Sequence, residues 1–542
     1  MATTLREASS SGRAGTARSS GVKAVASRWR VTLVAPLLLA LVACVQNPVT
    51  GKSELGLIAT SDEIAIGGQQ YSPSQQMQGG VYVSDPELGD YVSRVGRRLA
   101  AVSDRDLPYE FVVLNSSVPN AWALPGGKIA INRGLLTELD SEAELAAVLG
   151  HEITHAAARH GAQAMERGML TQGALAAASV AIGVSGYGDY SDLALGAAQV
   201  GAQLMTQKYG RDAERESDRY GMIYMKRAGY DPAAAVDLQQ TFVRLSEGRS
   251  SDWLSGLFSS HPPSQERVDN NRAFAAELGT GGEVGREAYQ AATANLRRKA
   301  PAYELADAAR KALAEKQWDT ALAKAEGAIK KVPAEAGFHA LAGDAHYGAK
   351  RYQKALQEYD RAVELDGSYY ANWQRRGMVN LELDRDAEAK RDLERAVALL
   401  PTAQSMNALG QLALAAGRTT DARAYLSAAA DSDSGAGSQA RTSLARLDLS
   451  AQPQRYVPVR YGLDGNGEVI AELRNDAPFA VTGLVLELRV REANGQVASR
   501  RLPVDGTFSA GAVKTLRTGI RLPAATAANA LDLRVVAARE AR

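Results

Sequence analysis

The spacing of apolar and polar residues changes several times along the chain, and each change predicts a boundary. An apolar run occupies residues 31–42. Small residues recur with a regular period between about 302 and 436, and beyond 453 apolar residues alternate with polar ones. The stretch from 62 to 285 contains at least two helical patterns. Because 542 residues leave room for three or four domains, these patterns predict a multi-domain protein.

The region 302–436 is predicted to be a repeat array. Alanines recur there at intervals of 34, 34 and 33 residues, a second series follows each by seven, and glycines precede three of the first series by twelve. The two alanine series are Ala321, Ala355, Ala389 and Ala422, and Ala328, Ala362, Ala396 and Ala429. A 34-residue period with small residues where paired helices touch is typical of tetratricopeptide repeats, which stack into an all-α superhelix with a concave face. A generic helical bundle is the alternative. Such arrays usually bind a protein partner in the groove, which the sequence does not name.

The last ninety residues differ from the repeats. Helical periodicity is expected to stop after the Ser/Gly/Asp stretch at 431–438, and alternating runs separated by Asn-Gly pairs follow. These short strands predict a small all-β, sandwich-like domain at 453–542. Linkers are predicted on either side of the repeats, at 286–301 and 437–452.

A candidate metal-binding helix contains His151-Glu152-Ile153-Thr154-His155. Ser141 and Glu144 form a capping box at its predicted start. Residues four apart lie on one face of a helix, so both imidazoles point toward one ion. The glutamate beside the first histidine can reach a water on that ion and act as its general base. A solvated helix face that carries His and Glu by chance is the alternative.

A second helical stretch begins at Glu214 and is predicted to end near Gly229. Glu214 and Asp218 are four residues apart and share a face. A catalytic zinc usually takes three protein ligands, so one carboxylate from this helix would complete the set. Asp218 could then orient a ligand histidine. An exposed face of ordinary charged pairs is the alternative.

The combined pattern resembles the M48 metallopeptidases, a gluzincin family of zinc endopeptidases. H-E-x-x-H is followed by E-x-x-x-D, preceded by an N-A-x-A-x-P-G-G segment and succeeded by an H-P-x-S-x-x-R segment. In this chain the last two are Asn120-Ala121-Trp122-Ala123-Leu124-Pro125-Gly126-Gly127 and His261-Pro262-Pro263-Ser264 with Arg267. The match extends over about residues 62 to 275. It departs at Trp122 and Ser217, where Phe and Ala are usual.

The resemblance implies an α+β zincin-like metalloprotease domain at 62–285. It implies one Zn²⁺ per chain held by His151, His155 and Glu214, with Glu152 as the base and Asp218 behind the ligands. It also implies that the strand with Asn120, Ala121, Trp122, Ala123 and Leu124 lines the cleft and binds substrate. An exposed edge strand can bind an extended peptide through its backbone, which fits that role.

His261 is a candidate fourth zinc ligand. It lies in a loop whose prolines would hold it extended. A neutral imidazole at the open position would displace the nucleophilic water and silence the enzyme. Some M48 proteins with repeat domains carry a switch histidine in this segment, so a removable ligand is our hypothesis. The alternative is that His261 contacts substrate or caps a turn.

The N-terminus predicts a signal peptide at 1–43 that ends at the only cysteine, Cys44. Basic residues precede the apolar run, which is too short to span a bilayer as a helix. Leu41-Val42-Ala43-Cys44 resembles a bacterial lipobox, so we expect Cys44 to be lipidated and 44–61 to form a tether. This predicts a periplasmic protein anchored by lipid to the inner face of the outer membrane of a Gram-negative bacterium. An incidental cysteine after an ordinary signal peptide is the alternative.

Composition narrows the possible partners. The formal net charge is +1, and no basic stripe or Gly-rich phosphate loop occurs, so no nucleic-acid partner is expected. Residues 168–204 are rich in Ala and Gly and broken by glycines, which predicts two small-residue helices over the active site instead of a membrane span. Membrane contact is therefore expected through the lipid anchor only.

Two functions remain open from the sequence. The chain is an active envelope endopeptidase whose repeats recruit unfolded or stalled envelope proteins, or it is mainly a chaperone or assembly scaffold with a silenced protease site. The complete set of catalytic residues favours the first.

Overall fold

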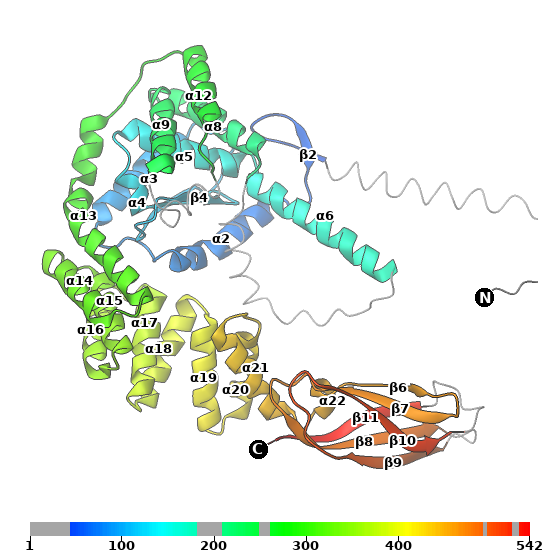
Figure 1. The fold of residues 1–542 in the computed structure, drawn as a ribbon. Helices are drawn as coiled ribbons and strands as arrows, with labels where there is room; N and C mark the ends of the chain where they lie inside the picture. Colours follow the sequence, from blue (N-terminus) through cyan, green and yellow to red (C-terminus); the bar gives the residue numbers. More distant parts are fainter. Residues whose placement is uncertain (1–43, 182–208, 249–260, 492–495, 523–530, 542) are drawn as a thin grey trace, which may run out of the picture.

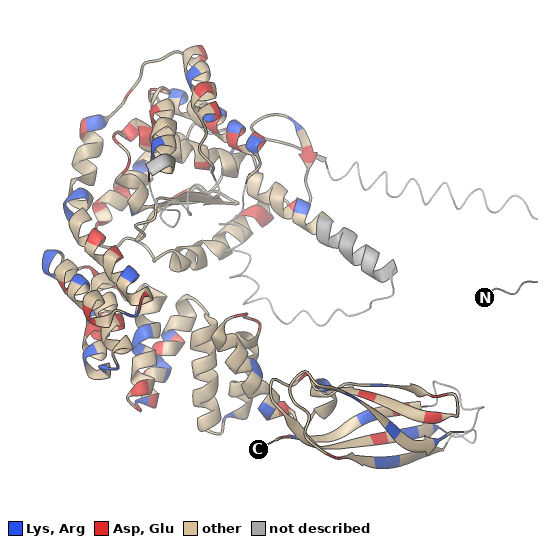
Figure 2. Cartoon of the chain, in the orientation of Figure 1, with Lys and Arg blue, Asp and Glu red and all other residues tan. Residues whose placement is uncertain are grey.

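The protein is described by a computed structural model that places residues 44–181, 209–248, 261–491, 496–522 and 531–541 (Figure 1). The predicted signal peptide, the part of the 168–204 stretch beyond Ala181 and the Asn494-Gly495 turn lie outside these residues. Within them, no helix combines the length and the apolar character that crossing a membrane requires. Lys and Arg are interspersed with Asp and Glu over the molecule (Figure 2).

The segment after Cys44 is a hairpin, so the tether predicted for 44–61 is wrong. Strand β1 (Cys44–Gln46) pairs antiparallel with β2 (Ser53–Leu55). Asn47 closes the turn, since its Oδ1 accepts hydrogen bonds from the backbone of Val49 and Thr50. Its Nδ2 donates to the carbonyl of Ala158, which fixes the hairpin to the rest of the domain. Helices α2 (Thr60–Met77) and α3 (Pro86–Ala100) follow.

The domain predicted at 62–285 is built on a three-stranded sheet with the order β3-β5-β4. Strand β3 (Glu110–Leu114) runs parallel to β5 (Lys128–Asn132), and β4 (Ala121–Leu124) pairs antiparallel with β5 at the edge. The turn between β4 and β5 requires glycine, because Gly126 and Gly127 have φ of 76° and 84°. The short helix α4 (Arg133–Leu136) follows β5.

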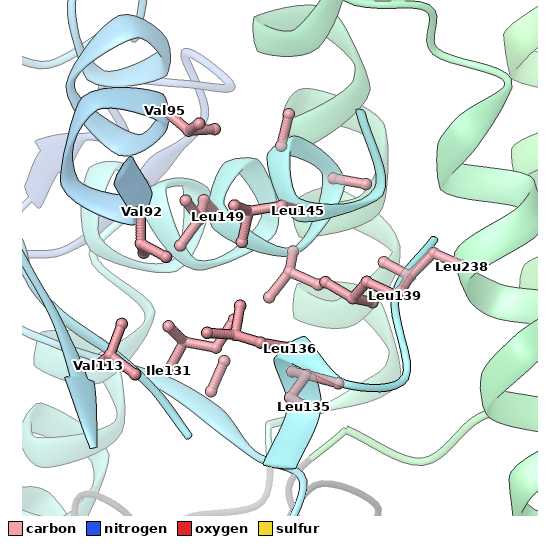
Figure 3. Close-up of a cluster of buried hydrophobic side chains, with 14 of the residues drawn as sticks. Val92, Val95, Val113, Ile131, Leu135, Leu136, Leu139, Leu145, Leu149 and Leu238 are labelled. Atoms are coloured by element: carbon pink, nitrogen blue, oxygen red, sulfur yellow. The ribbon is translucent and has the colours of Figure 1, made fainter. Parts of the chain in front are cut away.

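Helix α5 (Glu142–Ala157) lies at the centre of this domain, and all of its residues are buried. Figure 3 shows Leu145 and Leu149 of α5 between Val92 and Val95 of α3 and the side chains of Val113 and Ile131 from the sheet. The remaining helices surround it: α6 (His160–Ala181), α8 (Arg211–Arg227), α9 (Ala234–Gly248) and α12 (Gln265–Leu278). The α+β fold predicted for this domain is therefore confirmed.

Helix α13 (Arg286–Ala314) corrects the linker predicted at 286–301, since it runs unbroken from the protease domain into the repeats. Its buried residues Tyr289, Thr293 and Leu296 recur at helical spacing on one face. Tyr289 donates to the carbonyl of Leu136, and Arg297 donates to that of Leu139. The segment is helical because its apolar face packs on the protease core.

The repeat array is confirmed as a series of antiparallel helix pairs. After α13 it comprises α14 (Trp318–Lys331), α15 (Ala336–Gly348), α16 (Tyr352–Leu365), α17 (Tyr370–Glu382), α18 (Asp386–Leu399), α19 (Ala403–Ala415) and α20 (Thr419–Ala430). All eight periodic alanines are fully buried. A Cβ on Gly343, Gly377 or Gly410 would lie 2.4–2.8 Å from the side chain sixteen residues later. The small residues therefore mark helix contacts, as predicted.

Helicity extends beyond the expected end of the repeats. Helix α21 (Gly435–Asp448) occupies most of the linker predicted at 437–452, and its N-cap Ser434 accepts a hydrogen bond from the backbone of Gly437. The Ser/Gly/Asp stretch supplies this N-cap and does not terminate helical structure. The short helix α22 (Pro453–Tyr456) leads into the last domain.

The C-terminal domain is a sandwich of two three-stranded sheets with the orders β10-β7-β6 and β11-β8-β9. Its strands are β6 (Val459–Leu463), β7 (Glu468–Arg474), β8 (Val481–Arg491), β9 (Val497–Val504), β10 (Val513–Arg521) and β11 (Leu531–Glu540). Neighbouring strands pair antiparallel. Both sheets contribute to one core, which includes Val469, Leu484 and Val535. The predicted all-β domain is confirmed.

Candidate metal centre

The helix with the H-E-x-x-H motif begins as predicted. Ser141 is the N-cap of α5, and its hydroxyl accepts a hydrogen bond from the backbone N–H of Glu144 at 3.2 Å. The Glu144 carboxylate accepts in return from the backbone N–H of Asp140 at 2.8 Å, one residue before the N-cap. This capping box fixes the register in which His151 and His155 share one face.

Helix α8 approaches α5 closely because two glycines meet at the crossing. A Cβ on Gly221 would lie 2.9 Å from the backbone nitrogen of His151, and a Cβ on Gly150 would lie 3.0 Å from the carbonyl oxygen of Gly221. No other residue type permits this separation without a shift of backbone. The contact brings Glu214, two turns before Gly221, to the two histidines.

Four side chains converge at this crossing: His151, His155, Glu214 and His261. The Nε2 atoms of His151 and His155 are 3.0 Å apart, and the Nε2 of His151 is 3.3 Å from Nδ1 of His261. Oε1 of Glu214 is 3.5 Å from Nε2 of His155 and 2.9 Å from Nδ1 of His261. The structure thus brings together all the metal ligands predicted from the sequence, including His261.

These separations are close to those around a tetrahedral metal ion. With bonds of about 2.05 Å, the ligands of such an ion lie about 3.3 Å from one another. The individual contacts range from 2.9 to 3.6 Å, with Glu214 contributing Oε2 toward His151 and Oε1 toward the other two residues, and one ligand atom from each of the four residues lies within 4.8 Å of the others. The outward ring nitrogens of His151 and His155 each have a hydrogen-bond partner, which leaves their Nε2 lone pairs facing each other. A cation between them removes that repulsion, so the residues fit the zinc that the sequence resemblance implies.

Asp218 lies behind the ligands, as predicted. Its Oδ1 is 3.0 Å from Nδ1 of His151, which fixes the imidazole tautomer with its free lone pair on Nε2. Arg267 binds both carboxylate oxygens of Asp218, at 2.8 and 2.7 Å, and its Nη1 lies 3.0 Å from Oε2 of Glu214. Burial raises the pKa of Asp218, but the guanidinium of Arg267 outweighs it and lowers that pKa below its usual value.

Arg267 had no assigned role in the sequence, although it belongs to the H-P-x-S-x-x-R segment that carried the resemblance. Ser264 caps α12 and accepts from the backbone N–H of Arg267, which aims the guanidinium at the carboxylates of α8. The sequence signal that could have revealed this role was a basic residue at a fixed distance after His261.

His155 is held by a chain of contacts that the sequence did not reveal. His160 begins α6, a helix separate from α5, because the chain turns at Arg159, whose φ is 64°. Nδ1 of His155 is 2.9 Å from Nδ1 of His160, and Nε2 of His160 is 3.3 Å from Oε1 of Glu216. In the tautomers that satisfy both contacts, each imidazole donates to the next acceptor.

Burial prepares the reacting groups for metal chemistry. It lowers the pKa of His155 well below its usual value, so this imidazole is neutral. Burial raises the pKa of Glu214, but His261 and His151 outweigh it and hold that pKa well below its usual range. Burial raises the pKa of Glu152, which brings a general base closer to neutral pH. Oε2 of Glu152 has no hydrogen-bond partner among the described residues.

The expected substrate strand is β4, at the edge of its sheet and packed directly on α5. Its four residues are nevertheless buried, and Asn120 before it is buried as well. Trp122, where Phe is usual, packs edge-on against Tyr71. Ser217, where Ala is usual, is buried with its hydroxyl 3.4 Å from His160. Substrate binding by β4 stays a prediction.

A mainly apolar cavity adjoins Glu152 and His261 on the side of α8 and α9. Its apolar walls are Ala147, Val148, Met222, Met225, Ala235, Leu238 and Phe242. Gln239 also lines it, and its buried Oε1 has no hydrogen-bond partner among the described residues.

Comparison with known proteins supports the assignment of the peptidase domain and of the repeats. The sequence profile of peptidase family M48 matches residues 86–274, and that of the tetratricopeptide repeat matches 306–370 and 376–437. Metalloprotease YcaL of Escherichia coli (strain K12) is 31% identical over 195 residues, which are 35% of this chain and 73% of that protein.

Two longer relatives match the same part of the chain. The beta-barrel assembly-enhancing protease of Yersinia pestis is 29% identical over 242 residues, 43% of this chain and 47% of the relative. The mitochondrial metalloendopeptidase OMA1 of Schizosaccharomyces pombe is 37% identical over 181 residues, 33% of this chain and 50% of the relative. The match spans about half the length of these proteins. The metal cluster, the glutamate beside it and these matches together show that the chain belongs to peptidase family M48, with tetratricopeptide repeats after the peptidase domain.

Proposed function

We propose that this chain is a zinc-dependent endopeptidase of the bacterial envelope that hydrolyses misfolded or stalled envelope proteins. One observation carries the proposal: His151, His155 and Glu214 converge on a tetrahedral site, with the buried Glu152 beside it. Three protein ligands and an adjacent carboxylate base are the parts that metal-assisted peptide hydrolysis needs.

The residues divide the work as follows. Zinc, when bound, lowers the pKa of its bound water to about 7 and polarises the substrate carbonyl. Glu152 takes the proton of the attacking water at Oε2 as the new C–O bond forms. It then delivers this proton to the amine nitrogen, which leaves as the peptide C–N bond breaks. Asp218 and His160 hold the imidazoles of His151 and His155 in the binding tautomer, and Arg267 keeps Asp218 ionised.

The test compares two variants with the wild type on an unfolded protein substrate. Glu152→Gln keeps the fold and the zinc but loses proteolysis, because an amide cannot accept the proton. Glu214→Ala loses the metal itself, measured as zinc per chain. Proteolysis by Glu152→Gln at the wild-type rate overturns the mechanism.

The proposed substrate class is supported by a named relative, by the repeats and by the cavity beside Glu152. The Yersinia relative is named for its role in enhancing beta-barrel assembly, which points to envelope proteins in transit. Repeat arrays of this kind bind extended segments of a protein partner. The cavity beside Glu152 places apolar side chains such as Val148 and Phe242 next to the proposed reacting groups.

We further propose that His261 restrains the enzyme as a removable fourth ligand. A catalytic zinc site keeps one position open, whereas here four protein atoms surround the site. Glu214 and Glu152 raise the pKa of His261 against the effect of burial, so hydrogen bonding to Glu214 is the competing role. His261→Ala should keep its zinc and degrade unfolded protein faster than the wild type. A slower variant assigns His261 to substrate binding or catalysis instead.

The same closed site favours the second function, a chaperone or assembly scaffold with a silent protease. The two functions differ in what Glu152→Gln does in cells that depend on the protein. A scaffold supports envelope assembly with this variant as well as with the wild type, whereas a protease does not.

We propose a periplasmic location, with lipid on Cys44 as the membrane anchor. The support is the lipobox-like sequence that ends at the only cysteine of the chain. Cys44→Ser should abolish lipidation and leave the protein uncut or soluble. If this variant fractionates with the outer membrane as the wild type does, the anchor is wrong.

A further inference from the structure

Four exposed apolar side chains gather where the N-terminal hairpin meets α6. Among the described residues, ten large apolar side chains are exposed, and Val45, Leu57, Met169 and Leu170 are four of them. They are 37%, 47%, 50% and 54% exposed. Of the other six, four lie in the C-terminal domain, and the remaining two are Val83 and Val284.

Hydrogen bonds join the end of the hairpin to α6, and the four residues lie close to these bonds along the chain; we refer to the four as the hairpin patch. Val45 packs on Gly56, where an added Cβ would lie 2.6 Å from the Cβ of Val45. The next residue, Leu57, donates its backbone N–H to Oε1 of Glu166 on α6 at 2.9 Å. Met169 and Leu170 lie three and four residues after Glu166, which is one helical turn further along α6.

The patch is fixed to the metal-binding helix. Arg159 follows the end of α5, and its guanidinium donates to the carbonyl of Ile58 at 2.7 Å and contacts Glu166 at 3.2 Å. Asn47 of the hairpin donates to the carbonyl of Ala158, the C-cap of α5. Any surface that covers the patch is therefore held at a defined position relative to His155.

We propose that this hairpin patch lies on the surface of a phospholipid bilayer. The proposal rests on the lipid anchor proposed above, because Cys44 immediately precedes Val45 and its backbone pairs with Leu55 beside the patch. An acyl chain on Cys44 anchors the protein to a bilayer at the residue next to Val45. At such a high effective concentration, weak burial of a few apolar side chains is sufficient for contact.

The consequence concerns substrate access. A bilayer on the hairpin patch lies next to the C-terminal end of α5, so the metal site faces the membrane interface at a constant height. Polypeptides that emerge at that interface reach the peptidase domain without full release into solution.

The test places one fluorescent label in the patch of the acylated protein. Leu170→Cys is labelled with an environment-sensitive dye. The dye reacts at position 170 alone, because acylation protects Cys44. The labelled protein is inserted into vesicles of phosphatidylethanolamine and phosphatidylglycerol that carry nitroxide on their acyl chains. The control is Val497→Cys, which is as exposed as Leu170 but lies in the C-terminal domain, far from β2 (Figure 1). The label at position 170 should be quenched, and the label at 497 should not.

Equal quenching at both positions in vesicle-bound protein overturns the patch and leaves the anchor intact. A blue shift at position 170 without quenching means that protein covers the patch, which also overturns the proposal. If mass spectrometry finds Cys44 unmodified, the anchor fails, and the patch proposal that rests on it fails as well.

A second measurement uses substitutions that leave the peptidase site unchanged. In the acylated protein labelled at position 170, Leu57→Ser with Met169→Ser should lower the quenching by the nitroxide, because two of the apolar contacts with the bilayer are lost. Leu463→Ser, a change at an exposed leucine outside the patch, should leave the quenching at position 170 unchanged. Equal quenching in both variants contradicts the proposal.

Discussion

The close approach of α5 and α8 makes Gly221→Ala a sensitive test of how the metal centre is assembled. The new Cβ would lie 2.9 Å from the nitrogen of His151 and 3.0 Å from the carbonyl carbon of Gly150. Both contacts are backbone atoms of a helix that is buried along its whole length, so no flexible side chain can yield. The two helices must separate.

The size of the effect follows from the geometry. Ordinary contact begins at 3.4 Å, so the helices move apart by about 0.5 Å. Metal–ligand distances tolerate only about ±0.2 Å, and Glu214 lies on the displaced helix about 10 Å from the contact. Overpacking costs ~1–3 kcal/mol, whereas replacing a helical glycine by alanine gains up to ~1 kcal/mol. We expect a net loss of ~0–2 kcal/mol in stability and a loss of ~10–100-fold in zinc affinity.

The assay is a zinc titration against a competing chelator, combined with thermal unfolding in the presence and absence of zinc. The control is Gly68→Ala on α2, where an added Cβ meets nothing within 4 Å. This exposed helical site should gain up to ~1 kcal/mol from the same chemical change and keep its zinc affinity.

The reasoning is refuted if Gly221→Ala binds zinc as tightly as Gly68→Ala and unfolds at the same temperature. A variant that loses stability but keeps its zinc affinity would show that Glu214 is positioned independently of the glycine contact.

Three further predictions concern residues around this centre and at the junction with the repeats. His160→Ala removes the hydrogen-bond partner of His155 Nδ1, so zinc affinity should fall ~10–100-fold. Saturating zinc should restore most of the proteolytic activity. A variant that stays inactive at saturating zinc would make His160 catalytic. Burial raises the pKa of Glu144, so its ionisation opposes folding and stability is lost as pH rises past its unfolded pKa of about 4.3. Glu144→Gln keeps the cap and should therefore be more stable than the wild type at pH near 7 but not at pH near 4, measured by urea unfolding; an equal gain at both values would contradict this. Glu335, on the loop before α15, accepts hydrogen bonds from Ser84 and Asn115 of the peptidase domain and from Tyr303. Glu335→Ala should therefore lower the free energy of unfolding by at least about 3 kcal/mol and allow proteolytic cleavage between the domains. An unchanged digestion pattern would contradict this.

Several parts of this protein follow from its sequence because they depend on local spacing. His151 and His155 share a face whatever surrounds the helix, since four residues make about one turn. Ser141 caps that helix through contacts within three residues. The alanines of the repeats are buried because each helix pair touches only its neighbours, so one period describes the whole array.

Predictions from the sequence were wrong where the local pattern of residues was weak and contacts with distant residues decide the structure. Residues 286–301 are helical because Tyr289 and Leu296 pack on the peptidase core, which composition alone did not indicate. The hairpin after Cys44 is ordered by Asn47 and Arg159, which are more than a hundred residues apart.

The identity of the metal-binding side chains was therefore determined by the sequence, whereas their assembly was decided by the tertiary structure. Glu214 reaches His151 because Gly150 and Gly221 let two distant helices touch, and Arg267 reaches Asp218 from a third helix. Spacing along one helix fixes directions within that helix, but it contains no information on how closely another helix approaches. That distance is set by the packing of side chains from separate segments, and it exists only in the folded protein.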